Sequence, residues 1–142
     1  MMHRIDNEDL LLNCLRLFDS SATESISERV GDLILYSKKL MQNADSYCMM
    51  QDEEIKGFIS FYANQVDTAF LTIIAVDDKE KGSGIGTRLL EQAFTVAIQR
   101  GMKSIRLEVH KKNIEAIAFY KKNHFKTESI SSHNYIFMTK EL

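Results

Sequence analysis

Apolar residues recur at helical spacing in two stretches at the start of the chain. The first stretch predicts a helix over residues 8–18, and the second predicts a helix that is capped by Ser25 or Ser27 and ends near Asn43. Between them, the polar run DSSATES over residues 19–25 predicts a loop. We therefore expect the chain to open with two helices.

The pattern then changes to short apolar runs, which are typical of strands. Residues 46–51 and 55–62 form two such runs on either side of the acidic turn DEE, which suits an antiparallel hairpin. Residues 67–76 form the next run, and the last six of them are almost wholly apolar. Such a composition is expected for a strand that is covered on both faces.

Helices and strands alternate in the remainder of the chain. A helix that starts near Gly84 is expected to end at Arg100 and Gly101, because a basic last turn followed by glycine is a common helix end. The other expected elements are a strand over residues 104–110, a short helix over residues 113–123, and strands over residues 125–129 and 134–142. This order of elements predicts a mixed α/β fold.

Length and composition predict a single domain that spans residues 1–142. A chain of this size buries roughly 70% of the surface that it exposes when unfolded, so its core needs no disulfide or metal. The 44% hydrophobic residues, the 27% charged residues and the net charge of −2 are ordinary for a soluble protein. Because the chain is not basic, we expect no general binding of nucleic acid, and an anionic ligand would need a local site.

The amino-terminal residues do not resemble a signal peptide, because acidic residues precede an apolar run that polar side chains interrupt. No window approaches about 18 uninterrupted apolar residues, so we expect a cytoplasmic protein with no membrane partner. Cys14 and Cys48 stand alone, without the spacing of a zinc site. We expect both thiols to be reduced and buried, and we expect no metal.

Three glycines stand close together in KEKGSGIGTRLL, residues 79–90, shortly after a strand that is expected to end at Val76. They are Gly82, Gly84 and Gly86. The first N–H groups of the following helix lack partners within the helix, and the helix dipole favours an anion beside them. Glycines also let a phosphate approach the backbone closely, so this stretch is a candidate anion site.

The spacing of the glycines does not fit two common nucleotide motifs. No Gly-Lys-Ser/Thr closes the stretch as in a P-loop, and Thr87 stands where Gly-x-Gly-x-x-Gly requires its third glycine. Lys81 adds a positive charge. On the glycines alone, a phosphate site and a plain turn before an amphipathic helix both stay open.

Residues 71–125 resemble the core of the GCN5-related N-acetyltransferases, the GNAT superfamily. The family motif Arg/Gln-x-x-Gly-x-Gly/Ala reads here as KGSGIG over residues 81–86, with a lysine that keeps the positive charge but lacks the planar group of arginine. By this resemblance, the backbone amides from Gly82 to Thr87 hold the pyrophosphate of coenzyme A. The resemblance also implies a mixed, mostly antiparallel twisted sheet of six to seven strands flanked by about four helices.

A second family motif, Asn-x-x-Ala-x-x-x-Tyr followed by Gly-Phe, reads here as Asn113, Ala116, Tyr120 and His124-Phe125. His124 replaces the glycine, so either this turn does not require a positive φ or it holds a strained residue. The resemblance assigns the asparagine and the strand before the glycines to pantetheine, and the tyrosine to the thioester sulfur. The residues assigned in this way to acetyl-coenzyme A are Ile74, Ala75, Val76, Lys81, Gly82, Ser83, Gly84, Ile85, Gly86, Thr87, Asn113 and Tyr120.

The strand residues Leu107-Glu108-Val109, with the asparagine and tyrosine downstream, look most like the ribosomal-protein alanine acetyltransferase branch. In that branch such a glutamate acts as base and such a tyrosine as acid. Acetyl transfer requires a neutral amine, and alternation along the strand separates Glu108 from its apolar neighbours. A carboxylate in the middle of a covered strand is unusual unless it is paired or functional. An ion pair with Arg106, or a solvated position at a sheet edge, are alternatives for Glu108.

Tyr120 is the candidate general acid that protonates the departing thiolate, although a purely structural aromatic is the alternative. A backbone amide near Ile74 or Val76 would stabilise the oxyanion. His110 is a further candidate for the base or for a water relay, or else a surface residue.

These residues predict transfer of an acetyl group from acetyl-coenzyme A to a primary amine, on a small molecule or peptide, by direct attack in a ternary complex. A catalytically inactive acetyl-coenzyme A sensor or interaction module is the alternative, and a different acyl donor stays open. The acceptor is not identified by the fold class, nor is the choice between monomer and homodimer. Acidic residues at Asp45, Asp52, Glu53, Glu54 and Asp67 are candidates to attract a cationic acceptor.

Overall fold

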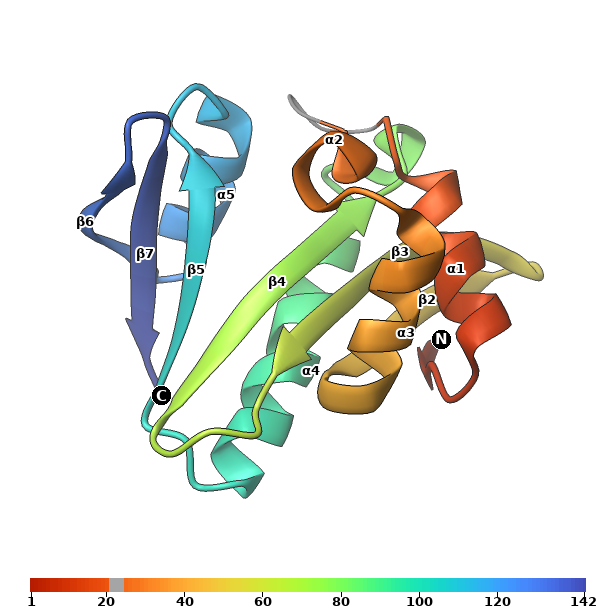
Figure 1. The fold of residues 1–142 in the computed structure, drawn as a ribbon, viewed down its shortest axis with the longest axis horizontal. Coiled ribbons are helices and arrows are strands. Elements are labelled where there is room, and N and C mark those ends of the chain that lie inside the picture. The colour runs from red at the N-terminus through yellow and green to blue at the C-terminus, as the bar shows by residue number, and fades with distance from the viewer. Residues whose placement is uncertain (21–24) are drawn as a thin grey trace.

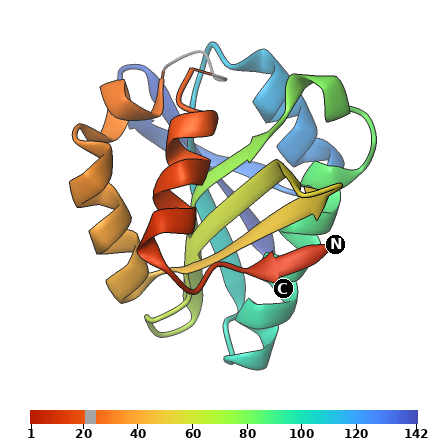
Figure 2. The same cartoon turned by 90° about the vertical axis from the view of Figure 1, so that its right-hand side faces the viewer.

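The computed structural model describes residues 1–20 and 25–142 and contains a central sheet with helices on both faces (Figures 1 and 2). The elements follow in the order β1 (Met2–Arg4), α1 (Glu8–Leu17), α2 (Ile26–Val30), α3 (Leu33–Asn43), β2 (Asp45–Gln51), β3 (Glu54–Tyr62), β4 (Thr68–Val76), the 3-10 helix η1 (Asp78–Glu80), α4 (Ile85–Gln99), β5 (Ser104–His110), α5 (Ile114–Lys122), β6 (Lys126–Ser132) and β7 (Tyr135–Glu141). This order confirms the predicted α/β class. The loop predicted over residues 19–25 falls largely on residues 21–24, which lie outside the described residues.

The sheet has seven strands in the order β1-β2-β3-β4-β5-β7-β6. All neighbouring strands are antiparallel except β4 and β5, which are parallel and pair only from Thr68–Leu71 to Ser104–Leu107. Beyond these pairs the two strands separate toward their carboxyl ends, as Figure 1 shows. A mostly antiparallel sheet is confirmed, and its one parallel pair opens into a V.

A β-bulge in β4 lies at the point where the strands part. Ser60 of β3 faces Ile73, but its neighbour Phe61 faces Leu71, so Thr72 is the extra residue. The bulge reverses the alternation of side chains: Leu71 packs in the core beside α4, whereas Ile73 packs in the core beside α1 and α3. Without the bulge, these two residues would share one face of the strand.

Two apolar cores therefore lie on opposite faces of the sheet. The face covered by α4 and α5 includes Leu89, Leu90 and Ile105, all of which are fully buried. The other face, covered by α1 to α3, includes Cys14 and Cys48. Both thiols are free and buried, as predicted, and the hydrogen bond between them together with burial raises the pKa of Cys14.

Two features of the amino-terminal half differ from the sequence-based expectation. The edge strand β1 is only three residues long, which is too short for a periodic pattern to reveal it. The second predicted helix is divided into α2 and α3 at Gly31, whose φ of 82° ends the first helix. Asp32 then caps α3, because its side chain accepts hydrogen bonds from the N–H groups of Ile34 and Leu35. This division gives one helix more than expected in this part of the chain.

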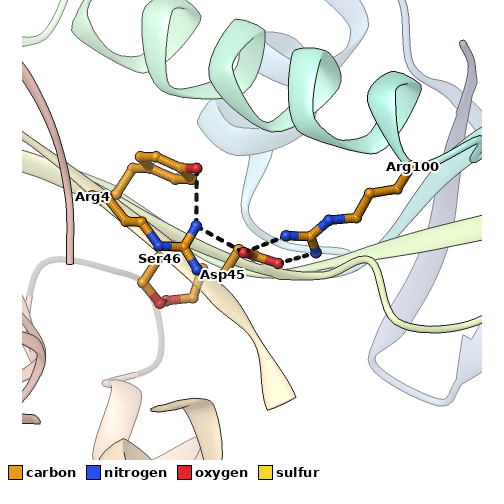
Figure 3. Close-up of polar contacts among 6 residues, drawn as sticks. Arg4, Asp45, Ser46 and Arg100 are labelled. Atoms are coloured by element: carbon orange, nitrogen blue, oxygen red, sulfur yellow. Dashed lines mark hydrogen bonds and ion pairs between the residues drawn. The ribbon is translucent and has the colours of Figure 1, made fainter. Parts of the chain in front are cut away.

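The carboxyl end of α4 is anchored by a buried carboxylate (Figure 3). Asp45, whose side chain is only 6% exposed, forms ion pairs with Arg100 at the end of α4 and with Arg4 of β1, the latter at 3.0 Å. Burial raises the pKa of Asp45, but the hydrogen bonds and charges of the two arginines outweigh it and hold the pKa below its ordinary value. Asp45 is thus a structural anion rather than an attractor of a cationic acceptor.

The carboxyl end of α5 retains the backbone shape that glycine would favour. His124 adopts a φ of 73°, and the Phe125 amide donates to the Tyr120 carbonyl at 3.0 Å. The turn therefore keeps the positive φ that the motif glycine would adopt. His124, which has a Cβ, takes this strained conformation.

Among the described residues, no helix is long and apolar enough to cross a membrane.

Candidate active site

A cleft lies between the separated ends of β4 and β5. Residues of both strands line it, and α2 and α5 add further walls. In Figure 1 this region is the open end of the V, with α5 beside β5 and α2 beside β4. Of the predicted site residues, Ile74, Ala75, Glu108, Asn113 and Tyr120 line this cleft together.

The backbone of β4 offers hydrogen-bonding groups to the cleft. The N–H of Asp77 donates to the carbonyl of Lys56 in β3 at 2.8 Å. Backbone groups alternate between the two edges of an antiparallel strand, so those of Ile74 and Val76 face away from β3 and toward β5. Because the pairing of β4 with β5 ends at Leu71, the backbone groups of Ile74 and Val76 have no partner on a neighbouring strand.

The amino end of α4 lies next to this strand edge and presents free donors. Its N-cap is Gly84, which has no side-chain cap, whereas Asn7, Ser25, Asp32 and Asn113 all cap their helices with side-chain oxygens. The first backbone hydrogen bond of α4 runs from Arg88 to the Gly84 carbonyl at 3.0 Å. The N–H groups of Ile85, Gly86 and Thr87 therefore have no acceptor among the described residues.

One amide of the predicted phosphate-binding run is already used. The N–H of Ser83 donates to the carbonyl of Glu80 at 3.1 Å, and the Ser83 hydroxyl donates to the same oxygen. The Ser83 amide is therefore already hydrogen-bonded within the protein, and the role of the amides from Gly82 to Thr87 toward a pyrophosphate stays a prediction. The donors that remain lie on both sides of Ser83, at the helix start and at Gly82.

The three glycines have different structural roles. Gly82 and Gly84 adopt φ values of 88° and 90°, and an added Cβ would meet no atom within 4 Å at either position. They are needed for the positive φ and leave open space around the backbone. At Gly86, by contrast, a Cβ would lie 2.9 Å from a ring carbon of Phe119 and 3.6 Å from Val76. Gly86 thus lets α4 and α5 pack closely beside the end of β4.

Lys81 is held by two carboxylates. Its Nζ lies 3.1 Å from Asp78 and 3.1 Å from Glu115, which is in the first turn of α5. Hydrogen bonds from these two acids raise the pKa of Lys81. The lysine is therefore charged, but an incoming anion would have to compete with Asp78 and Glu115 for it.

Asn113 and Tyr120 come to the cleft from the two ends of α5. The Asn113 side-chain oxygen caps the helix by accepting from the Ala116 N–H at 3.1 Å, which leaves its amide nitrogen as a donor. Tyr120 is 9% exposed and contacts the rings of Phe119 and Phe125. Burial raises the pKa of Tyr120 to about 12, although the positive charge of Arg29 acts in the opposite direction.

Glu108 lies on the exposed face of β5 and accepts a hydrogen bond from the Ser131 hydroxyl of β6. The alternative of an ion pair with Arg106 is wrong: Arg106 pairs with Glu128 at 2.8 Å and stacks on the Phe137 ring at 3.6 Å. The described residues provide no cationic partner for Glu108. Its exposure agrees with the alternative of a solvated position, so its role as a base stays a prediction.

His110 also reaches the cleft, but its ring is constrained. The Nδ1 atom accepts a hydrogen bond from the Lys112 N–H at 3.1 Å, and the ring meets Tyr135 edge-on with centroids 5.1 Å apart. Only Nε2 is left to exchange a proton with a ligand or with water.

Sequence reasoning missed several residues of the cleft, among them Arg29, Thr72 and Tyr135. Arg29 of α2 crosses to β4 and donates to the Thr72 carbonyl. Its local sequence is that of an ordinary surface helix, and no signal there points to β4. Tyr135 follows a turn in the chain and joins the site only because β7 pairs with β5.

The arrangement can bind an extended ligand that ends in an anion. The unpaired edge of β4 suits a chain with amide groups, and the free N–H groups of α4 with the open space at Gly82 and Gly84 suit a diphosphate. Glu108 and Tyr120 flank the cleft where the other end of such a ligand would lie. Acetyl-coenzyme A combines these features, and the residues present therefore fit it.

Comparisons with known proteins agree with this arrangement. The family model described as acetyltransferase (GNAT) family matches residues 11–125. Over 87 residues the chain is 36% identical to the uncharacterized protein YxbD of Bacillus subtilis (strain 168), a match that covers 61% of this chain and 53% of YxbD. The chain thus spans about half the length of that relative.

Solved structures show the same fold over the whole chain. The PaiA N-acetyltransferase of Thermoplasma acidophilum, in complex with coenzyme A, has a TM-score of 0.78 at 20% identity and covers 100% of this chain and 99% of its own. The ribosomal-protein-S18-alanine N-acetyltransferase of Escherichia coli has a TM-score of 0.76 at 22% identity, with 99% and 94% covered. These likenesses confirm the fold implied by the motifs. Since the family model spans most of the chain and includes both motifs, the chain belongs to the acetyltransferase (GNAT) family.

Proposed function

We propose that the protein transfers an acetyl group from acetyl-coenzyme A to a primary amine. The observation that carries this proposal is the parting of β4 from β5 after Leu71 and Leu107, which puts free backbone groups of β4 in one cleft with Glu108 and Tyr120. Family membership and the coenzyme A in the PaiA structure support the choice of donor.

Binding of the donor would use mainly backbone groups. The amides at the start of α4 would take the pyrophosphate, and Ile74, Val76 and the Asn113 amide nitrogen would take the amide groups of pantetheine. Lys81 would add its charge if the anion displaces Asp78 or Glu115. Acetyl-coenzyme A would supply an activated thioester carbonyl.

Glu108 would act as the general base. A protonated amine has no free electron pair, so the carboxylate must first take its proton, directly or through water. The neutral nitrogen then forms a bond to the thioester carbon, and the carbon–sulfur bond breaks with its electron pair on sulfur. An amide N–H of Ile74 or Val76, on the free edge of β4, would stabilise the negative charge on the carbonyl oxygen.

Tyr120 would act as the general acid that protonates the departing sulfur. With a pKa raised to about 12, its phenol keeps the proton throughout the neutral pH range and can donate it to sulfur as negative charge develops. The acylated nitrogen would give its remaining surplus proton to the Tyr120 oxygen, directly or through water, which restores the phenol. The products would be the N-acetylated amine and coenzyme A with a free thiol. The rings of Phe119 and Phe125 hold the Tyr120 ring in place.

The experiment is a thiol-release assay with acetyl-coenzyme A and a panel of amines. We expect Tyr120→Phe to lower kcat by at least about tenfold through loss of the general acid, with little change in coenzyme A affinity. Glu108→Gln should lower kcat/KM most strongly at low pH, where more of the amine is protonated. Matched controls are Tyr47→Phe, since Tyr47 is also 9% exposed but lies outside the cleft, and Glu91→Gln on the exposed surface of α4.

Two outcomes would count against the proposal. Unchanged turnover of Tyr120→Phe at saturating substrates would remove the acid assignment. Tight binding of acetyl-coenzyme A without thiol release from any amine would favour the alternative of an inactive sensor.

A further inference from the structure

A groove continues from the cleft along α2 and α3. Arg29 and Thr72 line both the cleft and this groove, so the two spaces adjoin each other. Its apolar lining consists of the aromatic residues Tyr36, Tyr62 and Phe70 and the aliphatic residues Val30 and Leu35. The groove lies on the same side of the sheet as α1 to α3, and its residues are absent from the motifs that resemble coenzyme A binding.

The groove carries an excess of positive charge. Arg29 and Lys39 line it, and among the described residues neither has a carboxylate within ion-pair distance. The acid of the groove, Asp32, is occupied as the cap of α3, where it accepts from backbone N–H groups at 2.8 and 3.2 Å. A negatively charged residue, Glu108, lies in the adjoining cleft.

Arg29 is fixed between the two spaces. One guanidinium nitrogen donates to the Thr72 carbonyl at the bulge of β4, and the Thr72 hydroxyl bonds to the Tyr36 hydroxyl at 2.9 Å. A guanidinium has five N–H donors in a planar fork, so donors remain for a ligand. Burial raises the pKa of Tyr120 while the charge of Arg29 lowers it, which indicates that the arginine charge acts close to the candidate acid.

We infer that the acceptor is a free amino acid with an apolar side chain, whose carboxylate binds Arg29 while its amine faces Glu108 and its side chain lies on Tyr36, Tyr62 and Phe70. A carboxylate matches the free face of a guanidinium, and such charge-assisted pairs are the stronger hydrogen bonds in proteins. Lys39 adds to the positive potential of the groove. The inference rests on the proposed function, since the amine must lie beside the thioester carbon.

The reaction would leave the carboxylate unchanged. The ammonium nitrogen gives one proton to Glu108 and forms a bond to the acetyl carbon. The carbon–sulfur bond then breaks as Tyr120 donates a proton to sulfur, and the nitrogen gives its second surplus proton to the resulting tyrosinate, directly or through water, which restores the phenol. The products are an N-acetylamino acid and coenzyme A. Arg29 is a specificity residue in this scheme, because it holds the acceptor and exchanges no proton.

The test compares phenylalanine with 2-phenylethylamine, which share the ring and the amine but differ in the carboxylate. We expect kcat/KM to be at least about tenfold higher for phenylalanine, as one charge-assisted hydrogen bond would give. Arg29→Gln should remove this preference through a higher KM for phenylalanine, with the KM for acetyl-coenzyme A nearly unchanged. Arg29→Lys should retain part of the preference.

The matched controls lie next to each other on α3. Lys39→Gln should reduce the preference modestly, whereas Lys38→Gln should not change it, since Lys38 is exposed and does not line the groove. Equal kcat/KM for both amines in the wild-type protein would overturn the inference. So would an Arg29→Gln variant that loses activity equally on both amines, because that result indicates a structural role through Thr72.

Calorimetry separates failure of this inference from failure of the proposed function. If no amine is acetylated, the proposed function fails, and binding of phenylalanine to the protein saturated with coenzyme A then tests the groove. Binding that Arg29→Gln weakens at least about tenfold supports the carboxylate site. Absence of binding, or binding that the variant leaves unchanged, overturns it.

Discussion

The two ends of α4 differ in how their polar groups are satisfied. At the amino end, Gly84 provides no cap and the N–H groups of the first turn have no acceptor among the described residues. At the carboxyl end, the Arg100 amide bonds within the helix and the Arg100 guanidinium pairs with the buried Asp45. The helix is thus open at one end, where a ligand can add hydrogen bonds, and closed at the other, where the protein supplies them.

This difference follows the parting of the strands. The closed end lies where β4 and β5 are paired, and the open end lies where they have separated. Free donors cost stability that a cap would otherwise provide, typically about 1 kcal/mol at a helix start. The other described α-helices all have side-chain caps, so the exception at Gly84 coincides with the place where an anion is expected.

The largest expected effect comes from closing the open end. Gly84→Asp should weaken coenzyme A binding by at least about a hundredfold, since a side-chain carboxylate would cap the helix and repel the pyrophosphate. Isothermal calorimetry with coenzyme A measures this change directly.

Gly101 provides the matched control at the closed end. It also has a positive φ, 79°, with no atom within 4 Å of an added Cβ. Gly101→Asp should therefore introduce a similar backbone strain, about 1 kcal/mol, without loss of coenzyme A affinity. Equal affinity losses in the two variants would show that strain, not the anion site, is responsible.

The next effect is a loss of stability when the closed end is opened. Asp45→Asn should lower the free energy of unfolding by about 2 kcal/mol, because charged hydrogen bonds to Arg100 and Arg4 are lost while the arginines remain partly solvated. Denaturant unfolding measures it, and coenzyme A affinity should not change. Asp67→Asn is the control. The ion pair between Asp67 and the Lys103 Nζ is exposed and 4.0 Å long, so its loss should change the free energy of unfolding by less than about 0.5 kcal/mol.

The pH dependence of the stability difference between wild type and Asp45→Asn tests whether the charge of Asp45 causes it. Burial raises the pKa of Asp45, yet the two arginines hold it below its ordinary value in the folded state. Its contribution is therefore fully present above about pH 4, the ordinary pKa of aspartate, and is lost as the pH falls through the lower folded-state value. A gap between wild type and Asp45→Asn that persisted unchanged at pH 2 would contradict a role for the charge.

The smallest effect concerns a third helix end, the carboxyl end of α5. His124→Gly should raise the free energy of unfolding by up to about 1 kcal/mol, because it relieves the strain of a φ of 73°. The greater freedom of glycine in the unfolded chain subtracts from this gain. Thermal unfolding measures the change, and Lys122→Gly, within the last turn of the helix, should instead destabilise. Destabilisation by both variants would show that His124 has contacts that outweigh its strain.

The sequence predicted the regular elements well where apolar periodicity is long. The bounds of α4 and β5 follow directly from spacing and from the Arg100–Gly101 ending. The strand β1 was missed because it is held by its pairing with β2 and not by its own pattern. The break at Gly31 was missed because an isolated glycine is tolerated in many helices, and only the fold requires α2 and α3 to separate there.

The residues of the candidate site also fall into those that a local sequence pattern predicts and those that only the fold reveals. Gly84, Asn113 and Tyr120 could be named because each stands at a fixed distance from its neighbours in one of two motifs, and their catalytic and binding roles stay predictions. Arg29 could not be named, because its place beside the cleft depends on a contact between α2 and β4. The two residues in contact, Arg29 and Thr72, are 43 positions apart in the chain. No local pattern encodes such a contact.

The sequence by itself determined the order of elements, the glycine-rich start of α4 and the family to which the chain is similar. The first two depend on backbone preferences and periodicity, which act over a few residues, and the family resemblance rests on two motifs with fixed spacing. Only the tertiary structure decided which donors stay free, that Asp45 belongs to the closed end of α4, and that Arg29 reaches the cleft. The physical reason is that hydrogen bonding and ion pairing are settled by which groups the fold brings within about 3 Å of one another.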